Sequence, residues 1–204
     1  VESLAAVALI FKHGSDSYKA IGNGRSLGTK LISLDGQFNN PGLYEVDLGT
    51  PLGTIIDDIG GGFNEDIKAI QIGGPLGGIV PVDILRSLTL DFEVFAEAGF
   101  LLGHARFVCI PRSFSAVEYA KHLFAFTAHE SCGKCFPCRL GSTRGKEMLG
   151  SAIDGKQKFS EELIYDLLET MEVGSLCALG GGLPLAIKNL LEHCSDEFKP
   201  LMEQ

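Results

Sequence analysis

The sequence predicts an α+β fold, in which a small strand-rich part precedes a helical part. Short apolar runs separated by glycine, proline and asparagine turns occupy residues 29–111. From residue 112 onward, apolar residues recur at intervals of three and four. Four predicted helices with short connections are typical of an antiparallel four-helix bundle. We therefore expect two domains, at residues 29–111 and 112–204, after a linker or remnant at residues 1–28.

The first residues give a weaker signal. Residues 1–10 are apolar on most faces and could form a strand or a helix that packs against a preceding segment. The chain does not begin with Met, so we expect it to be part of a longer protein. The loop at residues 22–28 has the glycine spacing G-x-G-x3-G, which is not the dinucleotide fingerprint. It gives little support to phosphate binding.

Residues 29–111 are expected to form a β-grasp-like domain, because strands and a short helix alternate over about eighty residues. Turn residues separate the first two strands, which predicts a hairpin. The predicted strands, in order, are Lys30–Leu34, Leu43–Asp47, Ile67–Ile72, the short run Ile79–Val80, and Phe107–Ile110.

A short helix is predicted between the second and third strands. Thr50 is the expected N-cap and Pro51 the first helical residue, and the glycines from Gly60 onward end the helix. The later glycine-rich turn at residues 73–78 could hold a ligand, but a chain reversal explains it as well.

The four helices of residues 112–204 have recognisable starts. Ser115 and Glu118 form a capping box at the first helix. The second is expected from Arg139 to about residue 153, the third from Ser160, and the fourth from near Pro184.

Four cysteines have the spacing of a ligand set for one cubane iron–sulfur cluster. Cys132, Cys135 and Cys138 have C-x2-C-x2-C spacing in the first interhelical loop, and Cys177 lies in the third. A [4Fe–4S] cube has four iron corners, and each needs its own thiolate. The two loops can meet at one end of an antiparallel bundle, which would then hold the cluster.

A structural zinc site is the competing interpretation, and four free thiols are a third. Zinc ribbons usually pair their ligands as two separate C-x2-4-C knuckles, whereas here three cysteines share one loop. The other two cysteines, Cys109 and Cys194, are expected to be small buried hydrophobic residues.

Positive charge surrounds the cysteine loop and would raise the reduction potential of a bound cluster. Lys134 and Arg139 lie within the loop; for Arg144 and Lys146 a solvated helix face explains the charge equally well. His129 is the one histidine that we consider as a neighbour of the cluster. No other constellation of acid, base and nucleophile stands out, so the expected chemistry is one-electron transfer.

Composition excludes several other classes. The net charge of −9 argues against general nucleic-acid binding. The longest apolar run, Leu4–Phe11, has only eight residues and is too short for insertion into a membrane. No signal-peptide pattern is present, so a cytoplasmic location is expected.

The motifs together resemble the flavin- and NADH-binding (diaphorase) subunit of respiratory complex I, NAD-linked formate dehydrogenases and NAD-linked hydrogenases. Both cysteine motifs are specific, and the resemblance covers nearly the whole chain. The matching segments are Glu130–Arg139 (ESCGKCFPCR), Ser175–Gly180 (SLCALG), Gly28–Leu31 (GTKL), Pro41–Val46 (PGLYEV) and Leu48–Leu52 (LGTPL).

The resemblance implies cofactors and partners. In this family a domain that binds FMN and NAD(H) precedes a β-grasp-like domain and a helical bundle with one [4Fe–4S] cluster; this chain resembles only the last two. It implies that Ala178 and Leu179 approach the flavin and that Glu2 ends a segment beside it. The implied partners are a thioredoxin-like [2Fe–2S] small subunit and a large iron–sulfur subunit with molybdopterin or tungstopterin.

Within the family, two segments are more similar to the formate dehydrogenase beta subunit than to complex I. These are Lys134–Gly145 and Cys177–Pro184. The sequence therefore favours an electron relay from formate to NAD+. The same relay in complex I or a hydrogenase, a zinc-stapled interaction module and ligand binding by the β-grasp-like part stay open as alternatives.

Overall fold

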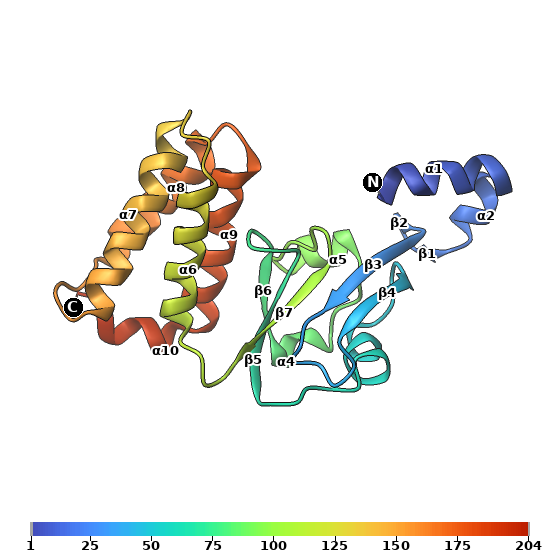
Figure 1. Cartoon of the computed structure of the whole chain (residues 1–204), viewed down its shortest axis with the longest axis horizontal. Helices are drawn as coiled ribbons and strands as arrows, with labels where there is room; N and C mark the ends of the chain where they lie inside the picture. Colours follow the sequence, from blue (N-terminus) through green and yellow to red (C-terminus); the bar gives the residue numbers. More distant parts are fainter. Residues whose placement is uncertain (1, 204) are drawn as a thin grey trace. The chain divides into compact units, whose positions relative to one another are not determined.

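A computed structural model describes residues 2–203 and divides the chain into two compact units (Figure 1). The first unit extends to Gly74 and includes Val80–Pro111. The second consists of Pro75–Ile79 and of the chain from Arg112 on. The part of the N-terminal prediction that concerns Val1 lies outside the described residues.

The first unit begins with two helices, α1 (Glu2–His13) and α2 (Ser15–Lys19). The apolar N-terminal segment is thus a helix rather than a strand. No residue of α1 is buried, and the exposed fraction of its Phe11 side chain is 88%. Two short strands, β1 (Gly22–Asn23) and β2 (Ser26–Leu27), then pair as a hairpin. The glycine-rich loop therefore lies in a hairpin, not between a strand and a helix.

A five-stranded mixed sheet organises the rest of this unit, in the order β4-β3-β7-β5-β6. Strand β3 pairs antiparallel with β4 and parallel with β7, and β7 pairs antiparallel with β5. The predicted strands and the predicted hairpin are confirmed. The bounds are β3 Thr29–Leu34, β4 Gly42–Asp47, β5 Ile67–Ile72, β6 Gly78–Pro81 and β7 Arg106–Pro111.

Short helices cover this sheet and complete its apolar core. They are α3 (Leu52–Thr54), which continues as a π-helix over Ile55–Ile59, then α4 (Val82–Leu85) and α5 (Phe92–Glu97). The side chains of Leu52, Ile55, Phe95 and Phe107 are fully buried. Because α4 and α5 have only four and six residues, no helical repeat could reveal them in the sequence.

The predicted N-cap at Thr50 is wrong. No side chain caps this helix, and the Thr50 hydroxyl instead donates a hydrogen bond to the Asp47 carbonyl, back toward the preceding turn, at 2.7 Å. Pro51 occupies the N-cap position instead of the first helical position, and the helix begins at Leu52.

Four long helices dominate the second unit. Contacts join α6 to α7, α7 to α8, α8 to α9, and α9 to α6, and α7 also contacts α9 (Figure 1). A short helix, α10 (Ser195–Phe198), and a 3₁₀ turn at Lys199–Leu201 follow. The long helices are α6 Ala116–Glu130, α7 Phe136–Ile153, α8 Glu161–Gly174 and α9 Ala178–His193. None of the described helices is long and apolar enough to cross a bilayer.

Two of these helices begin earlier than the sequence indicated. Helix α7 starts at Phe136 rather than Arg139, with Pro137 in its first turn, where a missing N–H is tolerated. Helix α9 starts at Ala178 rather than near Pro184, which lies buried inside it. Local propensity argued against a helix across three consecutive glycines, but tertiary packing overrides that preference.

The caps of α6 and α8 follow the predicted pattern. The Ser115 hydroxyl accepts a hydrogen bond from the Glu118 N–H at 3.4 Å, and the Ser160 hydroxyl accepts one from the Leu163 N–H at 3.2 Å. The apolar face of α8 is narrower than expected, since Leu163 is 48% exposed.

Glycines on α7 let two neighbouring helices approach closely. A Cβ atom on Gly145 would lie 2.3 Å from the ring of Phe124 on α6. A Cβ atom on Gly141 would lie 2.7 Å from Met171 Cγ on α8. Both distances are too short for non-bonded carbon atoms, so α7 needs glycine at these positions.

This packing predicts opposite effects for two glycine-to-alanine changes in α7. Gly145→Ala should destabilise the helical unit by about 1–3 kcal/mol, because the buried ring of Phe124 must move. Gly150→Ala should stabilise it by about 0.5–1 kcal/mol, since the nearest side-chain atom lies 4.0 Å from the new methyl group and alanine favours a helix. Denaturant unfolding measures both; equal effects would contradict the close packing.

Candidate metal centre

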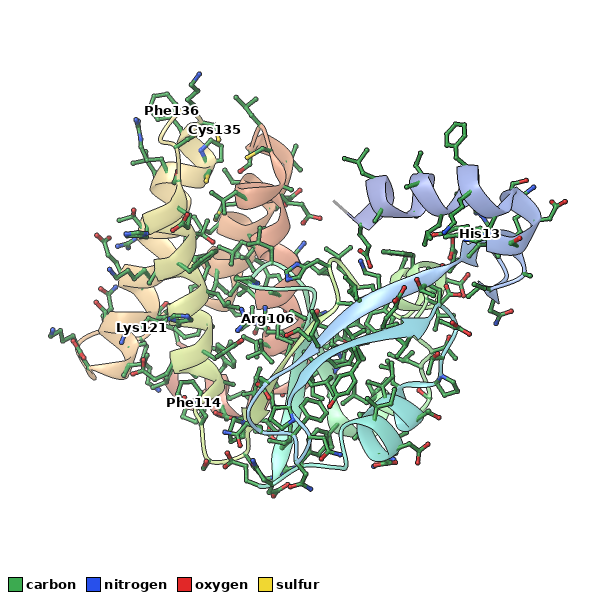
Figure 2. The ribbon with its side chains drawn as sticks, turned by 45° about the vertical axis from the view of Figure 1, so that its right-hand side comes forward. His13, Arg106, Phe114, Lys121, Cys135 and Phe136 are labelled. Carbon is green, nitrogen blue, oxygen red and sulfur yellow. The ribbon has the colours of Figure 1, made fainter. Side chains whose placement is uncertain are left out.

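The helix ends of the second unit position the four candidate cysteines. Cys132 lies in the loop between α6 and α7, Cys135 is the N-cap of α7, and Cys138 lies in its first turn. Cys177 is the N-cap of α9. Figure 2 shows Cys135 and Phe136 at this end of α7. Cys138 is buried and Cys135 half-buried, whereas Cys132 and Cys177 are exposed.

Hydrogen bonds hold the three-cysteine loop in a compact turn. Gly133 has a φ of 78°, a conformation that favours glycine, and its N–H donates to the Ser131 hydroxyl at 3.2 Å. The Arg139 guanidinium donates to the Gly133 carbonyl at 3.0 Å and lies 4.8 Å from the centre of the Phe136 ring. Arg139 thus ties the first turn of α7 to the loop.

The two cysteine segments are in contact. A Cβ atom on Gly180, in the first turn of α9, would lie 2.6 Å from Cys138 Cβ and 3.0 Å from its Sγ. A Cβ atom on Gly174, at the end of α8, would lie 2.8 Å from Pro137 Cγ. Only glycine permits these approaches, so the loops that the sequence expected to meet do meet.

Backbone groups also favour a thiolate at this point. A hydrogen bond from the Leu176 backbone N–H lowers the pKa of the Cys135 thiol, and backbone hydrogen bonding at Cys138 and Cys135 adds to it; desolvation opposes these effects. The Leu176 N–H belongs to the segment of Cys177, so each cysteine segment supports the other. Thiolates are the form that binds metal.

The donor set fits a [4Fe–4S] cluster. Four thiols occupy two touching segments, and a cube offers each its own iron. A single zinc ion would require four ligands to converge at about 2.3 Å. As they lie, no three histidine, cysteine or acidic side chains within residues 2–203 form a group that could hold a metal ion, so the present positions of the thiols do not separate a zinc ion from a cluster.

The remaining cysteines differ from each other. Cys109 lies in the core of the sheet unit as predicted, and burial raises the pKa of its thiol. Cys194 is only half-buried, because it lies at the junction of α9 and α10 rather than inside a helix.

The charged neighbours separate into two groups. Arg139 contacts the cysteine loop, and Lys134 is an exposed member of it. Arg144 lies farther along α7, 3.6 Å from Glu147 on an exposed helix face, and Lys146 is also exposed. His129 is exposed and lies 3.0 Å from the carboxylate of Glu130.

The residues with an expected flavin role lie in different units. Ala178 and Leu179 form the start of α9 in the second unit. Glu2 opens α1 in the first; its carboxylate pairs with Lys30 and accepts the Leu31 N–H at 2.8 Å. Burial raises the pKa of Glu2, but these hydrogen bonds and the Lys30 charge outweigh it and lower the pKa.

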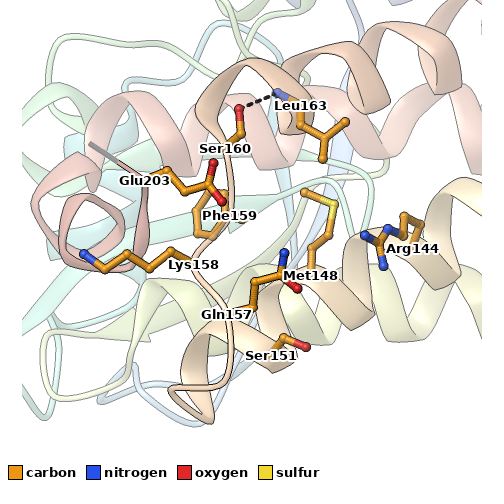
Figure 3. A pocket seen from close by; sticks show the side chains of 9 residues that line it. All are labelled: Arg144, Met148, Ser151, Gln157, Lys158, Phe159, Ser160, Leu163 and Glu203. Atoms are coloured by element: carbon orange, nitrogen blue, oxygen red, sulfur yellow. Dashed lines mark hydrogen bonds between the residues drawn. The ribbon is translucent and has the colours of Figure 1, made fainter.

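Each unit has a hollow on its surface. In the second, a cavity of about 90 Å³ lies between α7 and α8 (Figure 3), too small for a flavin or nucleotide. It is lined by Arg144, Met148, Ser151, Gln157, Lys158, Phe159, Ser160, Leu163 and Glu203. In the first, a groove of about 650 Å³ lies between α1 and β3, with Glu2, Leu9, Lys30 and Phe92 among its lining residues.

The glycine-rich turn at residues 73–78 is explained by backbone geometry. Gly73 and Gly74 have φ values of 98° and 89°, and a Cβ on Gly73 would lie 2.6 Å from the Leu102 carbonyl oxygen. A Cβ on Gly74 would lie 2.4 Å from the His104 ring. These contacts support a chain reversal.

Sequence reasoning missed two serines at the cysteine site. Ser131 Oγ lies 3.4 Å from Cys138 Sγ, and the buried Ser175 Oγ lacks a hydrogen-bond partner among the described residues. For Ser175, the sequence offered one signal, its position two residues before the candidate ligand Cys177. Its burial could not be inferred from that position.

The contact at Gly180 predicts a difference between two adjacent residues. Gly180→Ala should lower the stability of the helical unit by about 1–3 kcal/mol and reduce its iron content, because the methyl group would force Cys138 and α9 apart. Gly181→Ala should leave iron content unchanged, since its nearest neighbour would be 3.5 Å away. Iron analysis and thermal unfolding test this; equal iron content in both variants would contradict the packing argument.

Comparisons with known proteins place these features in a family. Residues 118–200 match the family described as the NADH-ubiquinone oxidoreductase-F iron-sulfur binding region. The chain is 35% identical to the HndC component of the NADP-reducing hydrogenase of Solidesulfovibrio fructosivorans, over 98% of this chain and 41% of that protein. It is 34% identical to the second F-type component of the NADH-quinone oxidoreductase of Rhizobium meliloti (strain 1021), over 100% of this chain and 49% of that protein.

A solved structure agrees with these relatives. The chain matches an NAD+-reducing [NiFe]-hydrogenase in the H2-reduced state with a TM-score of 0.86 and 27% identity, over 99% of this chain and 34% of that one. The chain spans less than half the length of these curated relatives. It therefore belongs to the family of diaphorase subunits, as a homologue of the C-terminal part that contains the iron–sulfur binding region.

Proposed function

We propose that this chain is the electron-relay part of an NAD-linked diaphorase subunit. Cys132, Cys135, Cys138 and Cys177 would hold one [4Fe–4S] cluster that passes single electrons to or from FMN and NAD(H). The observation that carries the proposal is the contact at Gly180, which holds the two cysteine segments together.

The residues of this chain suit a relay rather than a catalyst. Four thiolates would occupy all four irons, so no coordination position would stay open for a substrate. When bound, the cluster would supply one-electron oxidation and reduction. The buried side of Cys138 excludes water from part of the site, and the Arg139 guanidinium places positive charge at the loop. Both affect the reduction potential.

The supporting architecture is part of this proposal. We assign α6–α9 to an antiparallel four-helix bundle within residues 112–204, and residues 29–111 to a β-grasp-like domain, with residues 1–28 as the link to a flavin-binding domain. The pairwise contacts of the four helices support the first assignment. The central parallel pair β3 and β7, with antiparallel strands outside it, supports the second.

The flavin contacts follow from the same proposal. Ala178 and Leu179 would approach FMN from the first turn of α9, and Glu2 would lie near it. Most of the binding site for FMN and NAD(H) would be formed by residues outside this chain. Ala178 directly follows Cys177 in the chain, which supports a direct route between the cluster and the flavin.

For the whole assembly, we favour an NAD-dependent formate dehydrogenase in the cytoplasm. The support is the similarity of Lys134–Gly145 and Cys177–Pro184 to its beta subunit. Its partners would be a [2Fe–2S] thioredoxin-like subunit and a large iron–sulfur subunit with molybdopterin or tungstopterin. The relatives named above favour the alternatives, an NAD-linked hydrogenase or NADH:quinone oxidoreductase.

The electron donor distinguishes these assemblies. In the native complex, formate under an inert atmosphere should reduce the cluster, and hydrogen gas should not. Low-temperature EPR of anaerobic samples measures the reduction. Reduction by hydrogen alone would identify a hydrogenase, and reduction only by NADH would favour a quinone-linked complex.

The cluster assignment predicts the effect of removing one ligand. Cys177→Ala should reduce iron from about four atoms per chain to a small fraction of that and abolish electron transfer from NADH to the other clusters, because one iron would lose its thiolate. Cys194→Ala, which removes a thiol at the far end of α9, is the matched control and should keep its iron. Metal analysis and EPR of the dithionite-reduced protein provide the measurements.

The same measurements test the zinc-stapled interaction module. One zinc per chain, no iron and no EPR signal in the wild-type protein would support the interaction module and contradict the electron relay. Full iron content in Cys177→Ala would also contradict the ligand assignment.

A further inference from the structure

The hydroxyl of Ser175 is an unusual feature of the candidate metal centre. Its oxygen is buried, and no hydrogen-bond partner exists for it among the described residues. A buried hydroxyl without a partner lowers stability, so its presence in a native protein calls for an explanation. Ser175 follows the last residue of α8 and lies two residues before Cys177.

This hydroxyl and the Cys138 sulfur lie against the same residue, Gly180. Ser175 Oγ is 2.5 Å, and Cys138 Sγ 3.0 Å, from the position that a Cβ on Gly180 would occupy. Both atoms therefore lie against the same glycine, with no side chain of that residue between them. The Ser175 hydroxyl and the Cys138 sulfur are thus neighbours across Gly180.

A second hydroxyl contacts the same sulfur. Cys138 Sγ donates to Ser131 Oγ at 3.4 Å, and Ser131 Oγ also accepts the Gly133 N–H at 3.2 Å. A thiol has one proton to donate, and Ser131 already accepts it. The sulfur of a neutral thiol is only a weak acceptor for the Ser175 hydroxyl.

Binding to iron changes the role of this sulfur. An iron-bound Cys138 would have lost its proton and could only accept hydrogen bonds. The hydroxyls of Ser131 and Ser175 could then both donate to it. An anionic sulfur is a stronger acceptor than a neutral thiol, so the unsatisfied Ser175 hydroxyl would gain its better partner in that state.

We propose that Ser175 is a positioning residue that donates a hydrogen bond to the Cys138 sulfur and raises the reduction potential of the cluster. The inference rests on the proposed [4Fe–4S] assignment. A hydrogen bond to a ligand sulfur withdraws electron density, so it stabilises the reduced cluster more than the oxidised one. Ser175 therefore favours electron acceptance by this cluster.

The variant Ser175→Ala, in the full-length subunit within its native complex, tests the proposal. The variant should keep four irons, and its midpoint potential should shift to more negative values. The shift should correspond to a roughly three- to tenfold decrease in the equilibrium constant for reduction of the cluster. For one electron, a factor of ten corresponds to about 59 mV. After exchange into D2O, the deuterium coupling that EPR detects at the reduced cluster should be weaker in the variant than in the wild type.

The matched control is Ser142→Ala. Ser142 is also buried on α7, but its hydroxyl donates to the Cys138 carbonyl at 2.6 Å rather than to the sulfur. Removal of the Ser142 hydroxyl should change the equilibrium constant for reduction of the cluster by less than threefold relative to the wild type. A redox titration followed by EPR compares the three proteins.

The outcomes separate the inference from the proposed function. Four irons with an unchanged potential and deuterium coupling in Ser175→Ala would overturn the inference alone. A wild-type protein without iron would overturn the proposed function and the inference with it. If Ser175→Ala loses its iron, the variant Ser175→Thr distinguishes the two roles. A wild-type potential in Ser175→Thr supports the hydrogen bond. Loss of iron in Ser175→Thr assigns Ser175 a packing role and overturns the inference.

Discussion

The close approach of α9 to α7 at Gly180 is the contact on which the candidate metal centre depends. About forty residues separate the three-cysteine loop from Cys177, and only a residue without a side chain lets the first turn of α9 touch Cys138. A larger residue would push the two segments apart. The candidate ligand set therefore depends on glycine at this position.

The glycines of α7 extend the same principle through the helical unit. Gly141 and Gly145 bring α8 and α6 close to α7, and these contacts fix how the helices lie along one another. The position of Cys138 relative to α9 follows from that register. Glycine costs helix propensity at each site, but the closer packing of buried side chains offsets it. Packing far from the cysteines thus determines the geometry at their end.

The surroundings of the cysteines agree with the proposed electron transfer. The Leu176 N–H supports a thiolate at Cys135, Arg139 places a cation at the loop, and Ser131 Oγ lies within hydrogen-bond distance of the Cys138 sulfur. Each of these groups affects the relative stability of an oxidised and a reduced cluster. Homology to diaphorase subunits agrees with that chemistry, and this chain corresponds to less than half of such a protein.

The sequence by itself determined the local features: the strands at Thr29–Leu34 and Ile67–Ile72, the Ser160 cap, and the candidate ligand set. These depend on short-range periodicity, capping chemistry and ligand spacing, which neighbouring residues encode. Only the tertiary structure decided that α9 begins at Ala178, that Gly180 touches Cys138, and that the Ser175 hydroxyl is buried without a partner among residues 2–203. Glycine and proline favour a loop there by local propensity, and contacts between residues far apart in the chain reversed that preference.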